Sequence, residues 1–453
     1  MEEKYIAAIE IGSSHIRAAV GTVDDTGALT LLAVEEEHAV DVVRYGIVQN
    51  VDEVSNRIKR LILRLENYPS ISPRKIKGVY IGIGGRSTAS TSREVIRQFD
   101  EETDITAHIV DQIKEEAKAN GLTERTVIDV LPKDFIVDNL ECPNPVGTLG
   151  KSIRADINLI TCRPKILRNL DIAITERQQL AIKDRFVRQI SIADLVLTND
   201  EKKLGCMLVD FGAETTTVSI YRGGSLRYLA TLPLGSRNIT RDVMMLNNIT
   251  EERAEELKRA LGDAMNEEPN FRKSDFDGDA TKVNSGIRTR AGEIAVNILE
   301  QVKYAGYSLP NDIAGGIVVV GAGAKLKGFV DLLADQSKVK VRLGALPGTI
   351  RISDSRLQNT GMIDIIALLN AAATHNPVEC MEKPVSVNPT PDPFVDGEDD
   401  GPGIKPMKGG KKQKDRDDKP REKGPSRIKR IFGSIVSGWD SLLDDRESDE
   451  DDE

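Results

Sequence analysis

Cysteine and histidine are scarce in this sequence, which contains four of each among 453 residues. The cysteines lie far apart and form no CxxC pair, so we expect reduced, buried thiols in a cytosolic protein rather than disulfides or zinc ligands. They are Cys142, Cys162, Cys206 and Cys380. The histidines show no metal-ligand spacing, and we expect His15 to be a packing or surface residue rather than a catalyst.

Long apolar runs are missing as well. No stretch approaches the roughly 20 residues that a membrane-spanning helix needs, and the first residues lead directly into a strand pattern, so we expect no signal peptide. The formal net charge of −10 argues against a dedicated nucleic-acid binder. The 453 residues, 39% of them hydrophobic, can form two or more domains. We expect a soluble protein unless one segment lays it on a surface.

Two segments about two hundred residues apart share one pattern. Residues 9–14 and 209–216 each run from an apolar strand through an acid, an apolar residue and a glycine to small hydroxyl residues, and a β-branched run follows. This pattern predicts a β-hairpin whose tight turn presents backbone N–H groups and hydroxyls to an anion. The acid before each turn suits a hydrated Mg²⁺. Two copies predict two hairpins that face one nucleotide.

A third glycine turn, Gly321-Ala322-Gly323, follows the apolar strand at 317–320. A single Gly-x-Gly is most often an ordinary strand-to-helix turn, and either hairpin taken alone is most often a structural turn. These glycines would let the backbone approach a flat adenine closely. The ordered set of three favours a nucleotide site.

Hydrophobic periodicity predicts the remaining elements. Helices are expected over residues 54–65, 109–119, 166–174, 251–261, 289–304, 329–333 and 362–373. Strands are expected over residues 5–34 (a meander), 79–83, 157–162, 226–232 and 317–320. Residues 271–285 are polar and are expected to form a loop.

The composition changes after residue 375. Nine of the 19 prolines lie between 377 and 425, which predicts a disordered linker. In residues 427–443, the large apolar side chains fall within an arc of roughly 140° on a helical wheel. They are Ile428, Ile431, Phe432, Ile435, Val436, Trp439, Leu442 and Leu443. This predicts an amphipathic helix about 25 Å long, suited to lying in the headgroup plane of a membrane.

Charge favours a membrane for this helix over the alternative, a groove on another protein or on its own domain. Residues 408–430 carry 11 basic and 4 acidic side chains, which anionic lipid would attract. Gly433 and Gly438 reduce helix stability, so we expect the helix to form only when bound. Nine acids from Asp440 onward oppose this interpretation, and they must project into solvent or meet the basic linker.

The three turns, in this order, resemble the actin, sugar-kinase and heat-shock ATPase superfamily, which has two phosphate hairpins and an adenosine loop. Within it the sequence most resembles the FtsA family of bacterial cell-division actin homologues, over residues 5 to about 375 and again at the extreme C-terminus. The segments that carry the resemblance are residues 10–12, 46–48, 144–147, 159–162, 197–201 and 209–212. Asn-Pro-Val-Gly at 144–147 is the most specific, because other members carry a different insert there.

The resemblance implies an α/β, actin-like ATPase fold with two duplicated lobes and a small inserted α+β domain. The domains it implies are a first lobe at 1–83 and 162–198, the insert at 84–161, a second lobe at 199–360 with a smaller subdomain at about 236–312, a returning helix at 361–375, the disordered linker at 376–426, the membrane-targeting helix at 427–443 and an acidic tail at 444–453.

The resemblance also implies two cofactors, ATP and Mg²⁺, and their site residues. The terminal phosphates would be held by Gly12, Ser13, Ser14, Gly212, Ala213, Glu214, Thr215 and Thr216. Glu10 and Asp210 would hold Mg²⁺ through water. The adenosine would abut Gly321, Ala322 and Gly323. Glu255 and Lys258 would lie near the ribose and base, and the alternative for them is an exposed i,i+3 ion pair.

Three residues depart from the superfamily pattern. Glu10 stands where Asp is usual. The second turn reads Gly-Ala-Glu rather than Gly-Gly-Gly, and the Glu214 carboxylate would repel a triphosphate unless it points away or meets metal. Arg188 stands where related proteins carry a Gln or Glu that helps to position the attacking water. The residues therefore support ATP binding better than ATP hydrolysis, and no catalytic residue is assigned.

The function that the resemblance implies is an ATP-binding cell-division protein that polymerises and anchors the FtsZ ring to the cytoplasmic face of the bacterial inner membrane. FtsZ is the tubulin-like division GTPase, and its C-terminal peptide would bind the smaller subdomain of the second lobe. The other partners would be further copies of the chain, an anionic membrane surface and later divisome proteins. A polymer would align many weak membrane helices, so that the assembly binds where a monomer does not.

Two other functions are alternatives. A sugar-kinase-like phosphotransferase would need an Asp base beside the acceptor hydroxyl. Asp194 and Asp200 are the nearest candidates, and neither has a recognisable setting. A chaperone ATPase would need a folded substrate domain after residue 375, where only the linker and one helix are expected.

Overall fold

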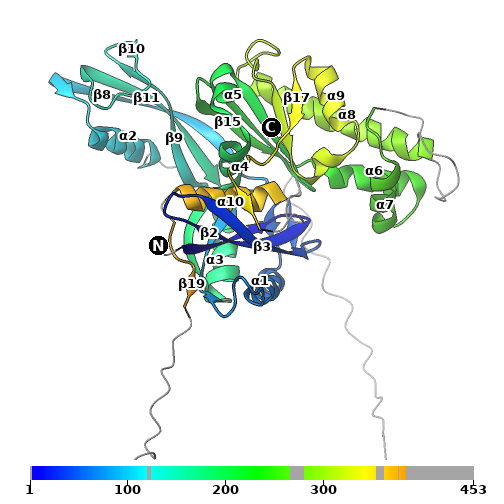
Figure 1. Ribbon diagram of the computed structural model, residues 1–453. Coiled ribbons are helices and arrows are strands. Elements are labelled where there is room, and N and C mark those ends of the chain that lie inside the picture. Colours follow the sequence, from blue (N-terminus) through cyan, green and yellow to red (C-terminus); the bar gives the residue numbers. More distant parts are fainter. Residues whose placement is uncertain (1–2, 120–123, 266–279, 354–361, 376, 384–453) are drawn as a thin grey trace, which may run out of the picture. The chain divides into compact units, whose positions relative to one another are not determined.

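The computed structural model describes residues 3–119, 124–265, 280–353, 362–375 and 377–383 (Figure 1). Its largest sheet has six strands in the order β12-β7-β1-β2-β3-β18. Their bounds are Ala181–Val187 (β12), Gly78–Ile83 (β7), Lys4–Ile11 (β1), His15–Val23 (β2), Leu29–His38 (β3) and Arg351–Ile352 (β18). A five-stranded sheet has the order β15-β14-β13-β16-β17. Its strands are Ser225–Leu232 (β15), Thr216–Arg222 (β14), Cys206–Phe211 (β13), Ile317–Val320 (β16) and Val341–Leu343 (β17).

These two sheets share one topology. In each, three consecutive strands form an antiparallel meander. Two later strands then extend the sheet in parallel from the first strand of the meander. The order β3-β2-β1-β7-β12 therefore corresponds to β15-β14-β13-β16-β17. Strands β1 and β13 are central and buried on both faces, which explains why their sequences are continuous apolar runs rather than alternating ones.

One C-terminal helix belongs to the first of these sheets. Helix α10 (Ile363–Thr374) packs against β1, β2 and β7, and against helix α4 (Arg188–Val196). It is apolar all round because most of its side chains are buried. Gly82 on β7 permits the close approach, since a Cβ there would lie 2.8 Å from Leu368 Cδ1. The helix predicted over 362–373 is confirmed.

The other elements around the six-stranded sheet are short, apart from one helix. Helix α1 (Val51–Glu66) packs on β2 and β3 and buries Val54, Ile58, Leu61 and Leu65, which confirms the helix predicted over 54–65. The remaining pieces are β4 (Val43–Arg44), β5 (Ile47–Val48), β6 (Lys75–Ile76), β19 (Met381–Glu382), α3 (Pro164–Asp171), a π-helix (Ile172–Glu176) and α5 (Asn199–Leu204). Strand β19 pairs with β6, so the disordered linker predicted from residue 376 is wrong at its start, and the rest of that linker lies outside the described residues.

A four-stranded antiparallel sheet lies between β7 and β12 in the sequence. Its order is β10-β9-β11-β8, and α2 packs on β8, β9 and β11, as Figure 1 shows. The elements are Ala89–Asp104 (β8), Ala107–Ala119 (α2), Thr126–Val137 (β9), Leu140–Glu141 (β10) and Leu149–Cys162 (β11). It has an apolar core of its own, which includes Ile113, Ile153 and Ile157.

Several helices share the hydrophobic core on one face of the five-stranded sheet. They are α6 (Ser236–Asn247), α7 (Glu251–Leu261), α8 (Ala280–Tyr304), a 3-10 helix (Ala322–Lys325) and α9 (Phe329–Ser337). Two sequence predictions need correction here. Helix α8 begins at Ala280 rather than 289, so residues 280–285 are not loop. Val283 and Ile287, one turn apart, are fully buried in this core, and this packing outweighs the polar composition of the segment.

Candidate functional site

The turns of the two predicted hairpins have the same geometry. The Gly12 N–H donates to the His15 carbonyl at 3.0 Å, and the Gly212 N–H donates to the Thr215 carbonyl at 2.9 Å. The second turn needs its glycine, because a Cβ on Gly212 would lie 2.9 Å from the carbonyl oxygen. The first turn is tight but less so, since a Cβ on Gly12 would lie 3.2 Å from the corresponding oxygen. Thr215 itself is buried. The two hairpins are confirmed as equivalent structures, each joining the first two strands of its meander.

The first turn contacts the loop between β4 and β5. The Ser13 hydroxyl is buried and accepts a hydrogen bond from the Gly46 N–H at 2.8 Å. Ser14 is half-buried, and its hydroxyl is 2.9 Å from His15 Nδ1. Gly46 has φ +71°, and a Cβ there would lie 2.6 Å from Gly85 Cα, so no other residue fits. The first turn is therefore held by a second, distant piece of backbone.

The second turn is bonded to the start of helix α6. The N–H groups of Ser236 and Arg237 donate to the carbonyls of Gly212 and Ala213 at 3.0 and 2.8 Å. Thr216 is fully buried, and its hydroxyl donates to a backbone carbonyl at 2.7 Å. The Thr216 side chain is thus placed to support the turn from within.

Glu214, whose carboxylate would repel a triphosphate unless it points away or meets metal, is 2% exposed. It accepts a hydrogen bond from the Tyr45 N–H at 2.7 Å. Two guanidinium groups neutralise it, from Arg237 at 3.3 Å and from Arg241 at 3.8 Å. Glu214 therefore joins the second turn to the β4–β5 loop that contacts the first turn. Sequence reasoning missed this link; the segment 46–48 was noticed only through the family resemblance.

The acids that precede the two turns meet on one side chain. Arg188, the first residue of α4, donates through Nη1 to Glu10 Oε1 at 2.8 Å and through Nη2 to Asp210 Oδ2 at 2.9 Å. Glu10 is 1% exposed and Asp210 is 2% exposed. The structure thus brings together two residues predicted from hairpins about two hundred residues apart.

Burial dominates the electrostatics of these carboxyl groups. It raises the pKa of Glu10 despite the nearby Arg188 guanidinium. Burial also raises the pKa of Asp210, to about 7, against the attraction of Arg188 and with the added repulsion of Asp364 and Glu10. Glu10 Oε2 has no hydrogen-bond partner and lies 3.8 Å from Arg17. Two buried carboxyl groups, one with an unpartnered oxygen, have the ligand chemistry that a hydrated cation prefers. The Arg188 guanidinium, however, already lies between the two groups.

Among the described residues, no group of three or more His, Cys, Asp or Glu side chains could enclose a metal ion directly. A pair of acids suits only a cation that keeps most of its water or takes phosphate ligands.

The third glycine turn lies against the end of β13. Gly321 has φ +88°, and a Cβ there would lie 2.4 Å from the Phe211 carbonyl oxygen and 2.8 Å from Asp210 Oδ1. A Cβ on Gly323 would lie 2.7 Å from the Phe211 ring. Ala322 begins the 3-10 helix between them. Packing against Phe211 is enough to require both glycines, and it places Gly321 beside Asp210.

Glu255 and Lys258 form an ion pair of 2.6 Å on α7, as their spacing predicted, but the pair is not an exposed surface feature. Lys258 is 8% exposed, and its ammonium group donates to Thr240 Oγ1 on α6 at 2.8 Å. The Thr240 hydroxyl donates to Glu255 at 2.6 Å. Burial lowers the pKa of Lys258. Burial opposes ionisation of Glu255 too, but Lys258 and the hydroxyl outweigh it and bring the pKa of Glu255 to about 2.

Lys258 also donates to the carbonyl of Ser236, the residue whose N–H bonds the second turn. Through α6, the pair is therefore connected to that turn. Within the described residues, neither Glu255 nor Lys258 hydrogen-bonds or pairs directly with Glu10 or Asp210.

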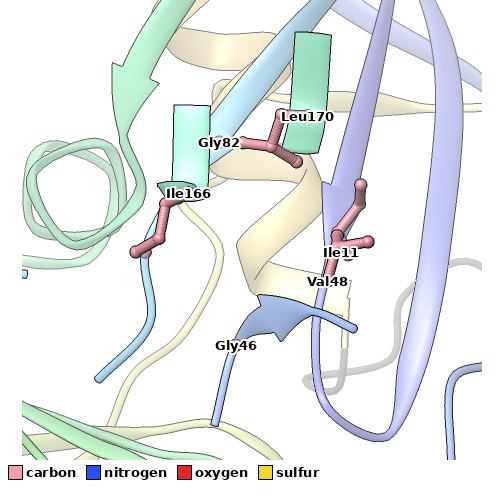
Figure 2. A pocket seen from close by; sticks show the side chains of 7 residues that line it. Ile11, Gly46, Val48, Gly82, Ile166 and Leu170 are labelled. Atoms are coloured by element: carbon pink, nitrogen blue, oxygen red, sulfur yellow. The ribbon is translucent and has the colours of Figure 1, made fainter. Parts of the chain in front are cut away.

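A small, partly open space lies behind the first turn, among residues of β1, β5, β7 and α3. Figure 2 shows the residues that line it, which are Ile11, Gly46, Val48, Gly82, Gly84, Ile166 and Leu170. Its volume is about 10 Å³, which is room for about one water molecule. This space is a packing gap behind the turn and is too small for a nucleotide.

The predicted membrane-facing residues of 427–443 lie outside the described residues. No helix in the described ranges has the length and apolar character needed to cross a membrane. Asp194, a candidate base of the phosphotransferase alternative, pairs with Lys202 at 2.7 Å on the surface. Asp200, the other candidate, is exposed in the first turn of α5.

The sequence matches two family profiles. "Cell division protein FtsA" matches residues 207–361, and "SHS2 domain inserted in FTSA" matches residues 85–161. Cell division protein FtsA of Porphyromonas gingivalis is 31% identical over 353 residues, which cover 74% of this chain and 72% of the relative. Cell division protein FtsA of Bacillus subtilis is 27% identical over 381 residues, which cover 80% and 83% of the two chains.

Among solved structures, a chain of the PilM–PilN type IV pilus biogenesis complex superimposes with a TM-score of 0.58. It is 15% identical and covers 81% of this chain and 98% of its own length, so the likeness concerns the fold alone. The profiles, the relatives and the duplicated sheet topology agree. The chain belongs to the FtsA family of cell-division proteins, and it has the actin-like ATPase fold with an SHS2 domain inserted.

Proposed function

We propose that this chain binds ATP between its two glycine hairpins. The observation that carries the proposal is the meeting of Glu10 and Asp210 on Arg188, because it brings two turns of identical hydrogen bonding to one place. A turn with free N–H groups and hydroxyls binds anionic oxygen. Two such turns on duplicated sheets suit the terminal phosphates of one nucleotide.

Each residue of the site has a proposed role. The terminal phosphates contact Gly12, Ser13 and Ser14 in the first turn, and Gly212 to Thr215 in the second, with Thr216 behind it. Glu10 and Asp210 are the acids that would hold Mg²⁺ through water where Mg²⁺ accompanies the nucleotide, and Arg188 already bonds both of them. Gly321, Ala322 and Gly323 abut the adenosine, and the buried pair of Glu255 and Lys258 lies towards the ribose and base.

Hydrolysis of the bound ATP is proposed to be slow or absent. Positioning the attacking water requires a group that accepts its hydrogen bond. Arg188 offers five donors and no acceptor, and it stays protonated. Each acid beside it is bonded to its guanidinium through one oxygen, and Arg188 stands where related proteins carry the residue that positions the water. ATP would therefore act as a bound effector that stabilises one arrangement of the protein.

The larger function is proposed to be polymerisation and attachment of the FtsZ ring to the cytoplasmic face of the inner membrane. Membership of a cell-division family supports it. The amphipathic pattern at 427–443, preceded by a basic segment, supports the membrane contact. The FtsZ C-terminal peptide is proposed to bind the subdomain that contains α6, α7 and α8, and later divisome proteins would follow.

A charge placed in the first turn tests the nucleotide site. Ser14→Asp puts a carboxylate beside the proposed phosphates and should weaken ATP binding at least about tenfold in calorimetry, which corresponds to about 1.4 kcal/mol. Thr26→Asp is the matched control, because Thr26 is exposed in the β2–β3 turn. Equal ATP affinity of the two variants, both folded by circular dichroism, would refute the site.

Flotation with anionic liposomes in the presence of ATP tests the membrane contact. The full chain should float, and a chain that lacks 427–453 should not. Trp439→Asp on the apolar face should reduce flotation, whereas Ser441→Asp on the polar face should leave it nearly unchanged. Flotation of the truncated chain at the level of the full chain would defeat the tether.

A further inference from the structure

The positive charge between Glu10 and Asp210 comes from a side chain of the protein, the Arg188 guanidinium. Arg188 contacts both carboxylates with separate nitrogens, at 2.8 Å to Glu10 and 2.9 Å to Asp210. Its side chain is 12% exposed. Such charge-assisted contacts from one planar guanidinium are strong and directional. Arg188 therefore spans the position that a cation shared by both acids would take.

The backbone around Arg188 holds the guanidinium there. Arg188 is the junction between β12 and α4, both of which are tied to neighbouring elements. A Cβ on Gly84 would lie 3.4 Å from Arg188 Cζ, so the guanidinium rests against the glycine turn that follows β7. Burial acts to lower the pKa of Arg188, but Asp210 and Glu10 raise it, so the charge is permanent.

The charges show what this arrangement does to a second cation. Arg188 faces both carboxyl groups, Arg17 lies 3.8 Å from Glu10, and Asp364 adds negative charge nearby. A divalent cation that approaches the acids would meet a fixed positive charge at the closest position, where repulsion is large in a buried site. Phosphates that approach would find the acids already partly neutralised. Arg188 therefore both repels a divalent cation and supplies part of the positive charge that such a cation would bring to the phosphates.

We propose that Arg188 is the resident cation of this site, so that the chain binds ATP with little dependence on Mg²⁺. The inference rests on the proposed function, since it concerns how the same site neutralises charge. Arg188 joins the two hairpins before nucleotide arrives, and it gives both carboxyl groups a counter-charge from within the chain. A neutral residue at 188 would leave the two buried carboxyl groups without this counter-charge, so that they would depend on Mg²⁺ to stay ionised beside the phosphates.

The test measures the affinity of the full chain for a fluorescent ATP analogue in excess Mg²⁺ and in EDTA. The ratio of the two dissociation constants should stay below about three for the unaltered chain. For Arg188→Gln the ratio should rise to about ten or more, which corresponds to about 1.4 kcal/mol. Arg185→Gln is the matched control, since Arg185 lies three positions earlier on β12 and pairs with Asp171 at the exposed surface. Its ratio should equal that of the unaltered chain.

Each outcome decides one claim. If the ratio of the two dissociation constants is the same for Arg188→Gln and for the unaltered chain, the proposal is overturned, whatever that ratio is. A ratio of about ten or more in the unaltered chain also overturns it, and that measurement stands even if Arg188→Gln does not fold. Arg188→Lys, which keeps the charge, should retain a low ratio. Absence of binding by the unaltered chain in both conditions would instead refute the proposed nucleotide site.

Discussion

Removing the Glu214 carboxylate should loosen the backbone that joins the two turns. Glu214 is buried, and its Oε2 accepts the Tyr45 N–H at 2.7 Å while Oε1 faces Arg237 at 3.3 Å. In Glu214→Ala the Tyr45 amide loses its only described acceptor. The link is a hydrogen bond to a charged group, which contributes about 1.5–3 kcal/mol.

This free energy translates directly into hydrogen exchange. If the β4–β5 loop opens locally, the Tyr45 amide should exchange about 10- to 150-fold faster in Glu214→Ala, since each 1.4 kcal/mol is about tenfold. Glu214→Gln keeps an oxygen acceptor without the charge and should show a smaller increase. Mass spectrometry of a peptide that contains residues 42–48 measures the effect.

The control is Glu251→Ala. Glu251 also pairs with Arg237 but makes no contact with Tyr45 in the described structure. It should leave exchange in 42–48 unchanged. If Glu214→Ala and Glu251→Ala give the same exchange rate in this peptide, the link between the second turn and the β4–β5 loop does not exist in solution.

Two further predictions concern packing and pH. Gly321→Ala should destabilise the protein by at least about 1 kcal/mol in urea unfolding, because its Cβ would lie 2.4 Å from the Phe211 carbonyl oxygen at a positive φ. Gly348 has open space around it, so Gly348→Ala should have a free energy of unfolding within about 0.5 kcal/mol of the unaltered chain. Equal unfolding midpoints for the two variants would contradict the close approach at Gly321. The pKa of Glu255 is lowered from 4.5 to about 2, so its contribution to stability is present above pH 4.5 and is lost as the pH falls towards 2. Glu255→Gln should flatten the acid limb of the stability profile over this range, and a limb identical to that of the unaltered chain would show that the ion pair with Lys258 is absent.

The local pattern of the chain determined most of the elements and the identity of the two hairpins. Each hairpin turn can be recognised in the sequence from an apolar run followed by an acid, an apolar residue and a glycine. This is possible because the hydrogen bond that closes the turn, from Gly12 or Gly212, spans only four residues. The helix at 251–261 and the strand at 317–320 were predicted to the residue. Their apolar spacing and terminal signals are local properties.

Only the tertiary structure decided how the charges of the site are paired. Arg188 is 178 positions from Glu10 and 22 from Asp210, and Tyr45 is 169 positions from Glu214. Hydrophobic periodicity contains no information about which charged groups meet, because that depends on the register of separate sheets. For the same reason Glu214 looked repulsive, Lys258 had an exposed alternative, and the first turns of α8 looked like a loop until burial of Val283 showed otherwise. The sequence determines structure that depends on contacts within a few residues. The burial and the pairing of charged side chains depend on contacts that only the folded protein makes.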